Sequence, residues 1–169
     1  VNLTRFNLFF PEKRDFFLEA SNFFTMGTGA SFTSTPVQTD LFFSRKIGLS
    51  DTGQPVPILG GARLTGKVGK NSIAVLDVQT DSAFGKPGDN FFVSRYSRDV
   101  LRRSRIGAIF INKESVDGSR HFNRTMGVDG NFSLGNSFQV SSYVARTATN
   151  PDASWLGGRP IGEGQDLAF

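Results

Sequence analysis

A glycine-rich stretch in the middle of the chain is the first candidate for chemistry. Residues Gly61 to Lys67 fit the spacing G-x-x-x-x-G-K, with which a P-loop wraps the phosphates of a nucleotide. A P-loop needs Ser or Thr at the next position to hold magnesium, and Val68 stands there instead. It must also lead into a helix, whereas the turn-forming sequence Gly-Lys-Asn-Ser follows at 69–72. We therefore expect no nucleotide site and assign these glycines to bends or close contacts within a strand.

Three carboxylates near the N-terminus, Glu12, Asp15 and Glu19, are the second candidate. Spacings of three and four residues would place them on one face of a helix. Glycoside hydrolysis needs two carboxyl groups that face each other across a sugar, about 5–9.5 Å apart, and one helical face offers no such cleft. The neighbouring Lys13 and Arg14 indicate ordinary ion pairing.

Metal and nucleophilic chemistry find little support in the side chains present. His121 is the one histidine and there is no cysteine, which excludes a two-histidine metal centre and any thiolate ligand within this chain. No G-x-S-x-G elbow accompanies His121, and the stretch from Asp129 to Asn131 lacks the spaced acids of a calcium loop. We expect no enzyme, no metal site and no cofactor.

Composition and charge narrow the class of protein. The 169 residues suit one domain, and 18 Phe among them exclude wholesale disorder. The net charge of +4 comes from scattered basic residues, and their densest group, at 98–105, falls where a turn is expected. We therefore expect no nucleic-acid partner. The apolar runs are short, as at 8–10, so no transmembrane helix is predicted.

Residues 1–35 differ in pattern from the rest of the chain. Phe pairs recur there every seven residues, which is two helical turns, and Pro11 suits a first helical position. We predict a short helix over 11–20 and a Gly/Ser/Thr-rich connector after it. So many Phe side chains must be covered, so we expect a plug or hinge inside or beneath the remaining structure, or a helix that caps it without function. The residues expected to pack there are Phe9, Phe10, Pro11, Glu12, Lys13, Arg14, Phe16, Phe17, Glu19, Phe23 and Phe24.

From residue 36 to 169 a period of two predicts antiparallel strands. In 58–68 the even positions are apolar or glycine, whereas the odd positions include polar and charged side chains, and 122–132 repeats this alternation. Further strands are expected at about 41–48, 72–80, 90–98, 105–113 and 137–146. Short turns at 69–72 and 133–136 alternate with longer polar loops at 81–89, 114–120 and 147–155.

Strands of this length, with short turns at one end and long loops at the other, are typical of transmembrane β-barrels. Aromatic side chains near strand ends would suit the two membrane interfaces: Phe91, Phe92, Phe122, Phe132, Phe138 and Tyr143. The apolar side chains expected to face lipid include Ile58, Ala62, Leu64, Met126 and Val128. The polar side chains expected to face a lumen are Arg63, Thr65, Lys67, Asn123, Thr125 and Asp129.

A soluble fold remains open on the residues alone, because alternating strands also build sandwiches and lipocalin-like barrels. The alternative is therefore a soluble β-sandwich that binds carbohydrate, with aromatic side chains stacked on sugar rings. A hydrolase ranks last, because no constellation of residues supports it.

The run Leu8-Phe-Phe-Pro-Glu-Lys-Arg-Asp-Phe-Phe-Leu-Glu19, within 2–19, is long and unusual in composition. It resembles the segment that opens the C-terminal barrel region of the bacterial DUF5916 family, whose members often carry an N-terminal carbohydrate-binding family 9-like domain. The similarity continues through 41–48, 57–67, 72–80 and 98–107, and more weakly through 121–146.

The resemblance implies an all-β, antiparallel outer-membrane β-barrel segment of a Gram-negative bacterium, of unestablished role. Family members are several times longer, and about six or seven strands fall short of the eight that the smallest such barrels need. We therefore expect a fragment of a larger barrel, surrounded by outer-membrane lipid and closed by its own remainder or a partner chain. The expected function is passage of a solute or capture of a glycan at the cell surface.

Overall fold

The computed structural model resolves a sheet of long strands and a set of short N-terminal elements. It describes residues 12–19, 21–27, 38–39, 41–42, 44–50, 52–101, 103–117, 121–134, 138–150 and 165–168. The short elements are α1 (Asp15–Leu18), the 3₁₀ helices η1 (Ser21–Phe23) and η2 (Ser44–Lys46), and the strands β1 (Met26–Gly27) and β2 (Gln38–Thr39). The strands of the sheet are β3 (Ile58–Val68), β4 (Asn71–Thr80), β5 (Asp89–Leu101), β6 (Ser104–Ser115), β7 (Phe122–Leu134), β8 (Phe138–Thr149) and β9 (Gln165–Ala168).

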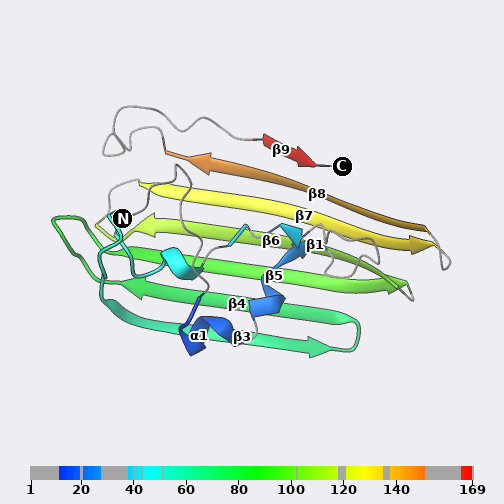
Figure 1. Cartoon of the computed structure of the whole chain (residues 1–169), viewed down its shortest axis with the longest axis horizontal. Helices are drawn as coiled ribbons and strands as arrows, with labels where there is room; N and C mark the ends of the chain where they lie inside the picture. Colours follow the sequence, from blue (N-terminus) through cyan, green and yellow to red (C-terminus); the bar gives the residue numbers. More distant parts are fainter. Residues whose placement is uncertain are drawn as a thin grey trace, which may run out of the picture.

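The seven strands β3 to β9 form one antiparallel sheet, in which neighbours along the chain are also neighbours in space (Figure 1). The all-β, antiparallel class predicted from the period of two is therefore confirmed. β1 and β2 pair with each other as a separate two-stranded unit. Among the described residues no helix is both long and apolar enough to cross a lipid bilayer.

The links between the long strands alternate in length. β3 and β4, and likewise β5 and β6, are joined by two residues at strand ends on the right of Figure 1, whereas the links from β4 to β5 and from β6 to β7 are longer and join strand ends on the opposite side. At the first short link, Gly69 has a φ of 59°, which a residue with a side chain rarely adopts. The alternation of short and long links therefore follows the turn-forming residues of the sequence.

The N-terminal helix is shorter than the predicted 11–20, since α1 covers only Asp15–Leu18. Arg14 offers no side-chain cap at its start, and the backbone of Glu19 is already extended at φ −64° and ψ 122°. The carboxylate of Glu12 accepts hydrogen bonds from the next two backbone N–H groups. It thus stabilises a turn before the helix rather than the helix itself.

The strand predicted over 41–48 is wrong. The 3₁₀ helix η2 occupies its middle, and the Arg14 guanidinium donates hydrogen bonds to the backbone carbonyls of Ser44 and Ile47. Gly48 then reverses the chain with a φ of 77°. The long sheet begins at Ile58.

The sheet has two faces of different surroundings. One cross-strand row, from β3 to β8, consists of Arg63, Leu76, Val93, Ile111, Thr125 and Thr147, and we call its side the covered face. The next row consists of Leu64, Val75, Ser94, Phe110, Met126 and Arg146, and we call its side the exposed face. Burial follows this division: along β4, alternate residues are buried from Ala74 to Thr80.

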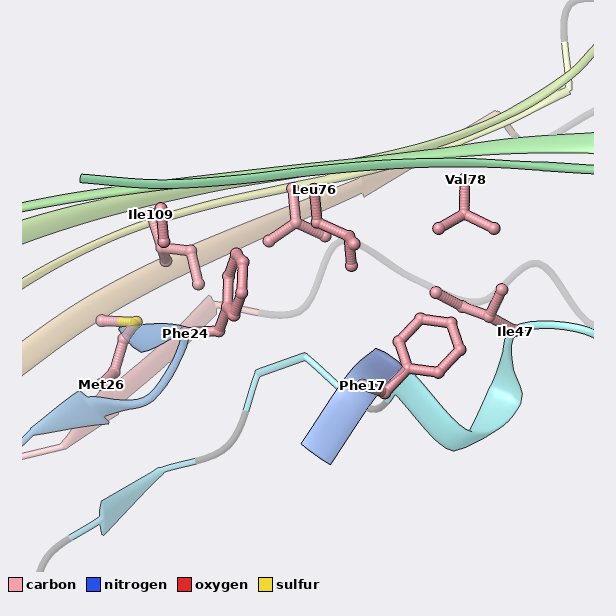
Figure 2. Packing of buried hydrophobic residues seen from close by; sticks show 9 residues of the cluster. Phe17, Phe24, Met26, Ile47, Leu76, Val78 and Ile109 are labelled. Carbon is pink, nitrogen blue, oxygen red and sulfur yellow. The ribbon is translucent and has the colours of Figure 1, made fainter. Parts of the chain in front are cut away.

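The N-terminal elements lie over the covered face and form a core with it (Figures 1 and 2). In the close view, side chains from the N-terminal elements point up toward the sheet, and labelled side chains of β4 and β6 point down toward them. The buried core consists of Phe17, Phe24, Met26, Ile47, Ala74, Leu76, Val78, Val93 and Ile109. The covered face is therefore apolar over β4 to β6, where these elements pack.

Gly127 of β7 lies directly against Met26 of the N-terminal segment, a name we use for the described residues between 12 and 50. A Cβ at this position would lie 3.0 Å from the Sδ of Met26, whose side chain is fully buried. A larger residue would force the Met26 side chain to shift, because a contact this short is tighter than ordinary van der Waals contact. The glycine thus allows β1 to approach β7 closely.

Large apolar side chains stand on the exposed face without cover from the described residues. Leu64 is 67% exposed, Met126 59% and Val128 56%. Others on the same face are Val68, Ile73, Tyr96, Ile106, Phe132, Phe138, Val140 and Val144. Monomeric soluble proteins rarely leave an apolar surface of this extent in water.

Candidate functional site

A buried ion pair lies on the covered face of the sheet. Arg95 of β5 donates two hydrogen bonds to the carboxylate of Asp129 on β7, at 2.5 and 2.8 Å. Each side chain is only 5% exposed. Two parallel bonds of this kind hold both groups in one orientation, which a single surface contact does not.

Gly107 of β6 makes this ion pair possible. Asp129 and Ser97 both face Gly107 across the sheet, so the Arg95 side chain must pass over β6 to reach its partner. A Cβ on Gly107 would lie 2.7 Å from Nη2 of Arg95 and 2.9 Å from Oδ1 of Asp129. Only a residue without a side chain leaves room for the guanidinium and the carboxylate at this position.

A second, more accessible group of charges lies beside the buried pair. The Asp99 carboxylate accepts hydrogen bonds from Nζ of Lys67 at 2.9 Å and from Nε of Arg105 at 2.8 Å. Lys67 comes from β3 and Arg105 from β6. These two cations are about half exposed, at 48% and 51%, so water and solutes reach them.

A cavity of about 210 Å³ opens between these charges and the N-terminal segment. Its wall consists of Asn22, Phe23, Thr25, Lys67, Ser72, Arg95, Ser97 and Arg105. Three of these side chains carry positive charge, four carry hydroxyl or amide groups, and one is aromatic. The two carboxylates, Asp99 and Asp129, do not line it.

Over β7 and β8 the covered face carries several hydrogen-bonded polar side chains. Thr125 and Thr147 share a hydrogen bond of 2.9 Å between their hydroxyl groups, and the Asn123 amide donates to the Thr149 hydroxyl at 2.7 Å. Farther along, the Asn131 amide donates to a serine hydroxyl on β8 at 3.0 Å. Beside the contact of Met26 with Gly127, this part of the covered face therefore presents paired hydroxyl and amide groups.

A hydrogen-bond network connects two parts of the N-terminal segment, the residues around α1 and those around η2. The Arg14 guanidinium binds the Glu12 carboxylate at 2.8 and 2.9 Å and also donates to the carbonyls of Ser44 and Ile47. The Ser44 hydroxyl donates to the same carboxylate at 2.9 Å. The Arg14 hydrogen bond, above all, lowers the pKa of Glu12 from its ordinary value of 4.5 to about 2. The network thus joins α1 to η2.

This lowered pKa makes the network sensitive to acid. In the folded protein Glu12 keeps its charge down to a pH of about 2, whereas in the unfolded chain it takes up a proton near 4.5. Its contribution to stability is therefore complete above pH 4.5 and is lost as the pH falls toward 2. We expect wild type to be more stable than Glu12→Gln at pH 6, with a difference that shrinks through this window. Urea unfolding of both proteins measures it; a difference independent of pH contradicts the assignment.

Arg63 fastens the segment to the first strand of the sheet. Its guanidinium donates to the carbonyl of Phe16, to the carbonyl of Glu19 at 2.5 Å and to the Glu19 carboxylate at 2.6 Å. The same guanidinium lies 5.4 Å from the centre of the Phe16 ring. Because Glu19 is 78% exposed, the backbone contacts contribute more than the ion pair.

The site residues predicted from the sequence, where the structure describes them, lie on the covered face, in the core beneath the N-terminal segment, or on the surface. The six polar residues expected on one side do share the covered face: Arg63, Thr65, Lys67, Asn123, Thr125 and Asp129. Of the residues expected to pack as a plug, Phe17 and Phe24 are buried against the sheet and Phe23 is partly buried. Phe16, Lys13 and Glu19 are exposed, and Phe9, Phe10 and Pro11 lie outside the described residues.

Sequence reasoning missed Arg95, Ser97, Asp99 and Arg105. The signal was present in β5, where Phe91 and Val93 begin an apolar phase that continues with Arg95 and Ser97. A charged residue in an apolar phase indicates a buried partner, but nothing local points to Asp129, which is 34 residues away.

In the described part of the chain no group of His, Asp and Glu side chains is arranged to hold a metal ion. Comparison of the chain with protein-family models, with curated proteins and with solved structures found no match. The resemblance to the DUF5916 family therefore stays a prediction. What the site offers chemically is a set of fixed cations and polar groups on one face of a sheet.

Proposed function

We propose that this chain forms part of the wall of an outer-membrane β-barrel in a Gram-negative bacterium. In this proposal the exposed face meets lipid and the covered face meets the lumen. The N-terminal segment lies within the lumen as a plug. The protein would pass a polar solute or capture a glycan at the cell surface, as the resemblance to the DUF5916 family also suggests.

The distribution of polarity along β7 carries this proposal. Thr125 and Asn131 are buried on the covered face, whereas Met126 and Val128, between them in sequence, are exposed. A soluble sheet turns its large apolar side chains inward and its polar ones to water. The reverse order is the one required when the outer surroundings are hydrocarbon and the inner ones are polar.

The dimensions of the sheet support the same proposal. β5 and β7 each have 13 residues and β3 has 11, enough to cross a bilayer at the tilt that barrels adopt. The short links at one end and longer ones at the other match the periplasmic turns and external loops of such proteins.

A barrel in lipid must also satisfy the edges of its sheet. β3 and β9 are the two edges, and each has one strand neighbour in the sheet. Lipid cannot supply hydrogen bonds to an unpaired strand edge. We therefore propose that both edges pair with further strands, from the remainder of the protein or from a partner chain.

A soluble, carbohydrate-binding sandwich is the second candidate. The exposed face would then pack against another sheet, or its aromatic side chains Tyr96, Phe132 and Phe138 would stack on sugar rings. This candidate accounts for the exposed apolar side chains. It gives no reason for the buried ion pair and the paired hydroxyl and amide groups on the opposite face.

Gel migration of the native protein from a membrane fraction tests the proposal. Closed barrels resist SDS without heating, so we expect an unheated band that shifts after boiling, at a size well above the 18.5 kDa of this chain. A band near 18.5 kDa in the soluble fraction, without a heat-dependent shift, would sink the proposal and favour the sandwich.

A further inference from the structure

We infer that the cavity between the N-terminal segment and the covered face binds a sugar acid, with the carboxylate of the ligand held between Lys67 and Arg105. The inference goes beyond the proposed barrel wall. It needs only the described residues of β3 to β6, of η1 and Thr25 after it, whichever strands complete the sheet.

The net charge of the cavity favours an anion. Lys67, Arg95 and Arg105 supply three positive charges, while Asp99 and Asp129 supply two negative ones. One positive charge is left over. Because the carboxylates do not line the cavity and the cations do, a ligand meets the positive groups first.

Lys67 and Arg105 have the donors that an incoming carboxylate needs. A lysine ammonium has three N–H groups and a guanidinium has five. In this site the Asp99 carboxylate receives one hydrogen bond from each of these cations. Arg95 differs, because its bidentate bond to Asp129 and its burial fix it in place, so it contributes charge rather than a movable contact.

The remaining wall suits a hydroxylated ligand of small size. Ser72, Ser97, Thr25 and Asn22 can exchange hydrogen bonds with sugar hydroxyl groups, and Phe23 offers an apolar ring face. The volume of about 210 Å³ is below the range of drug-sized ligand pockets. A single sugar ring with one carboxylate fits both the chemistry and the size.

Calorimetric titration of the native protein, purified from a membrane fraction into detergent micelles, tests the inference, with sodium glucuronate and glucose as the probes. We expect glucuronate to bind and glucose to bind at least about tenfold more weakly, because a charge-assisted hydrogen bond contributes about that factor. Lys67→Met and Arg105→Met should each raise the Kd for glucuronate about tenfold for the same reason. Ser97→Leu, which fills the cavity without changing charge, should also abolish binding.

The matched control is Arg98→Met. Arg98 is next to Ser97 in β5 but points to the exposed face. The substitution therefore removes one positive charge, as Lys67→Met and Arg105→Met do, without altering the wall of the cavity. It should leave the Kd for glucuronate unchanged. Equal weakening by Arg98→Met, equal binding of glucose, or no binding of glucuronate would each overturn the inference. None of these outcomes bears on the heat-dependent gel shift, so this inference and the proposed barrel can fail separately.

Discussion

Arg95→Met is expected to lower the free energy of unfolding by about 3–5 kcal/mol, because it leaves the buried Asp129 carboxylate without its partner. Both side chains are 5% exposed, so the carboxylate would lose its charged partner at a position largely shielded from water. Urea unfolding in detergent micelles, followed by the circular dichroism of the sheet, measures the loss. Gly107→Ala should act in the same direction, since its Cβ would lie within 3 Å of both charged groups, at 2.7 and 2.9 Å.

The double variant Arg95→Met/Asp129→Leu separates the pair from general damage to the sheet. Removing both charges removes the unpaired carboxylate, so it should recover most of the stability lost in Arg95→Met. Lys67→Met, which breaks a half-exposed pair, should cost about 1 kcal/mol or less. If Arg95→Met costs no more than Lys67→Met, the buried pair does not stabilise the fold as the geometry indicates.

Val128→Lys is the second substitution with a large expected effect. In a lipid-facing position near the middle of a strand, a lysine costs about 2–4 kcal/mol. In water the same change would be nearly neutral, within about 0.5 kcal/mol, because Val128 is 56% exposed and supports no core. The free energy of unfolding from lipid vesicles is the quantity to compare.

Ala62→Lys is the matched control for this substitution. Ala62 shares the exposed face, but its cross-strand row already holds Asp77, Asn112 and Arg124, as expected where the wall leaves the hydrocarbon. We expect a cost of about 0–1 kcal/mol there, as at a membrane interface. A neutral Val128→Lys, or equal costs for both variants, would contradict contact of this face with lipid.

The side chains on each face of β3 and β7 could be predicted, because the alternation of polar and apolar residues is a local property of the sequence. Each strand repeats its polarity every second residue, and the pleat converts that period directly into two faces. The stretch 105–113, apolar in both phases, gave no such assignment. Its structure explains why: Ile109 packs in the core beneath the N-terminal segment, while Ile106 and Phe110 lie on the exposed face.

The structure of the N-terminal segment and the position of the cavity could not be predicted, because both depend on contacts between residues that are distant in sequence. The alternation around Leu41 suggested a strand, but Arg14, about thirty residues earlier, takes the carbonyls that a neighbouring strand would have bound. The ion pair of Arg95 likewise requires the register of three strands and a glycine at the crossing point. Such features follow from the assembled sheet and not from any window of sequence.

Spin labels on the two faces test the lipid-facing claim most directly. The chain has no cysteine, so single-cysteine variants at Leu64, Thr65, Gly66, Lys67 and Val128 can each be labelled at one site in vesicles. Molecular oxygen concentrates in the bilayer and a water-soluble nickel complex does not. We predict high oxygen and low nickel accessibility at positions 64, 66 and 128, and the reverse at 67, with low values for both at 65. High nickel accessibility at 64, 66 and 128 would mean that the exposed face meets water, and the barrel proposal would be wrong.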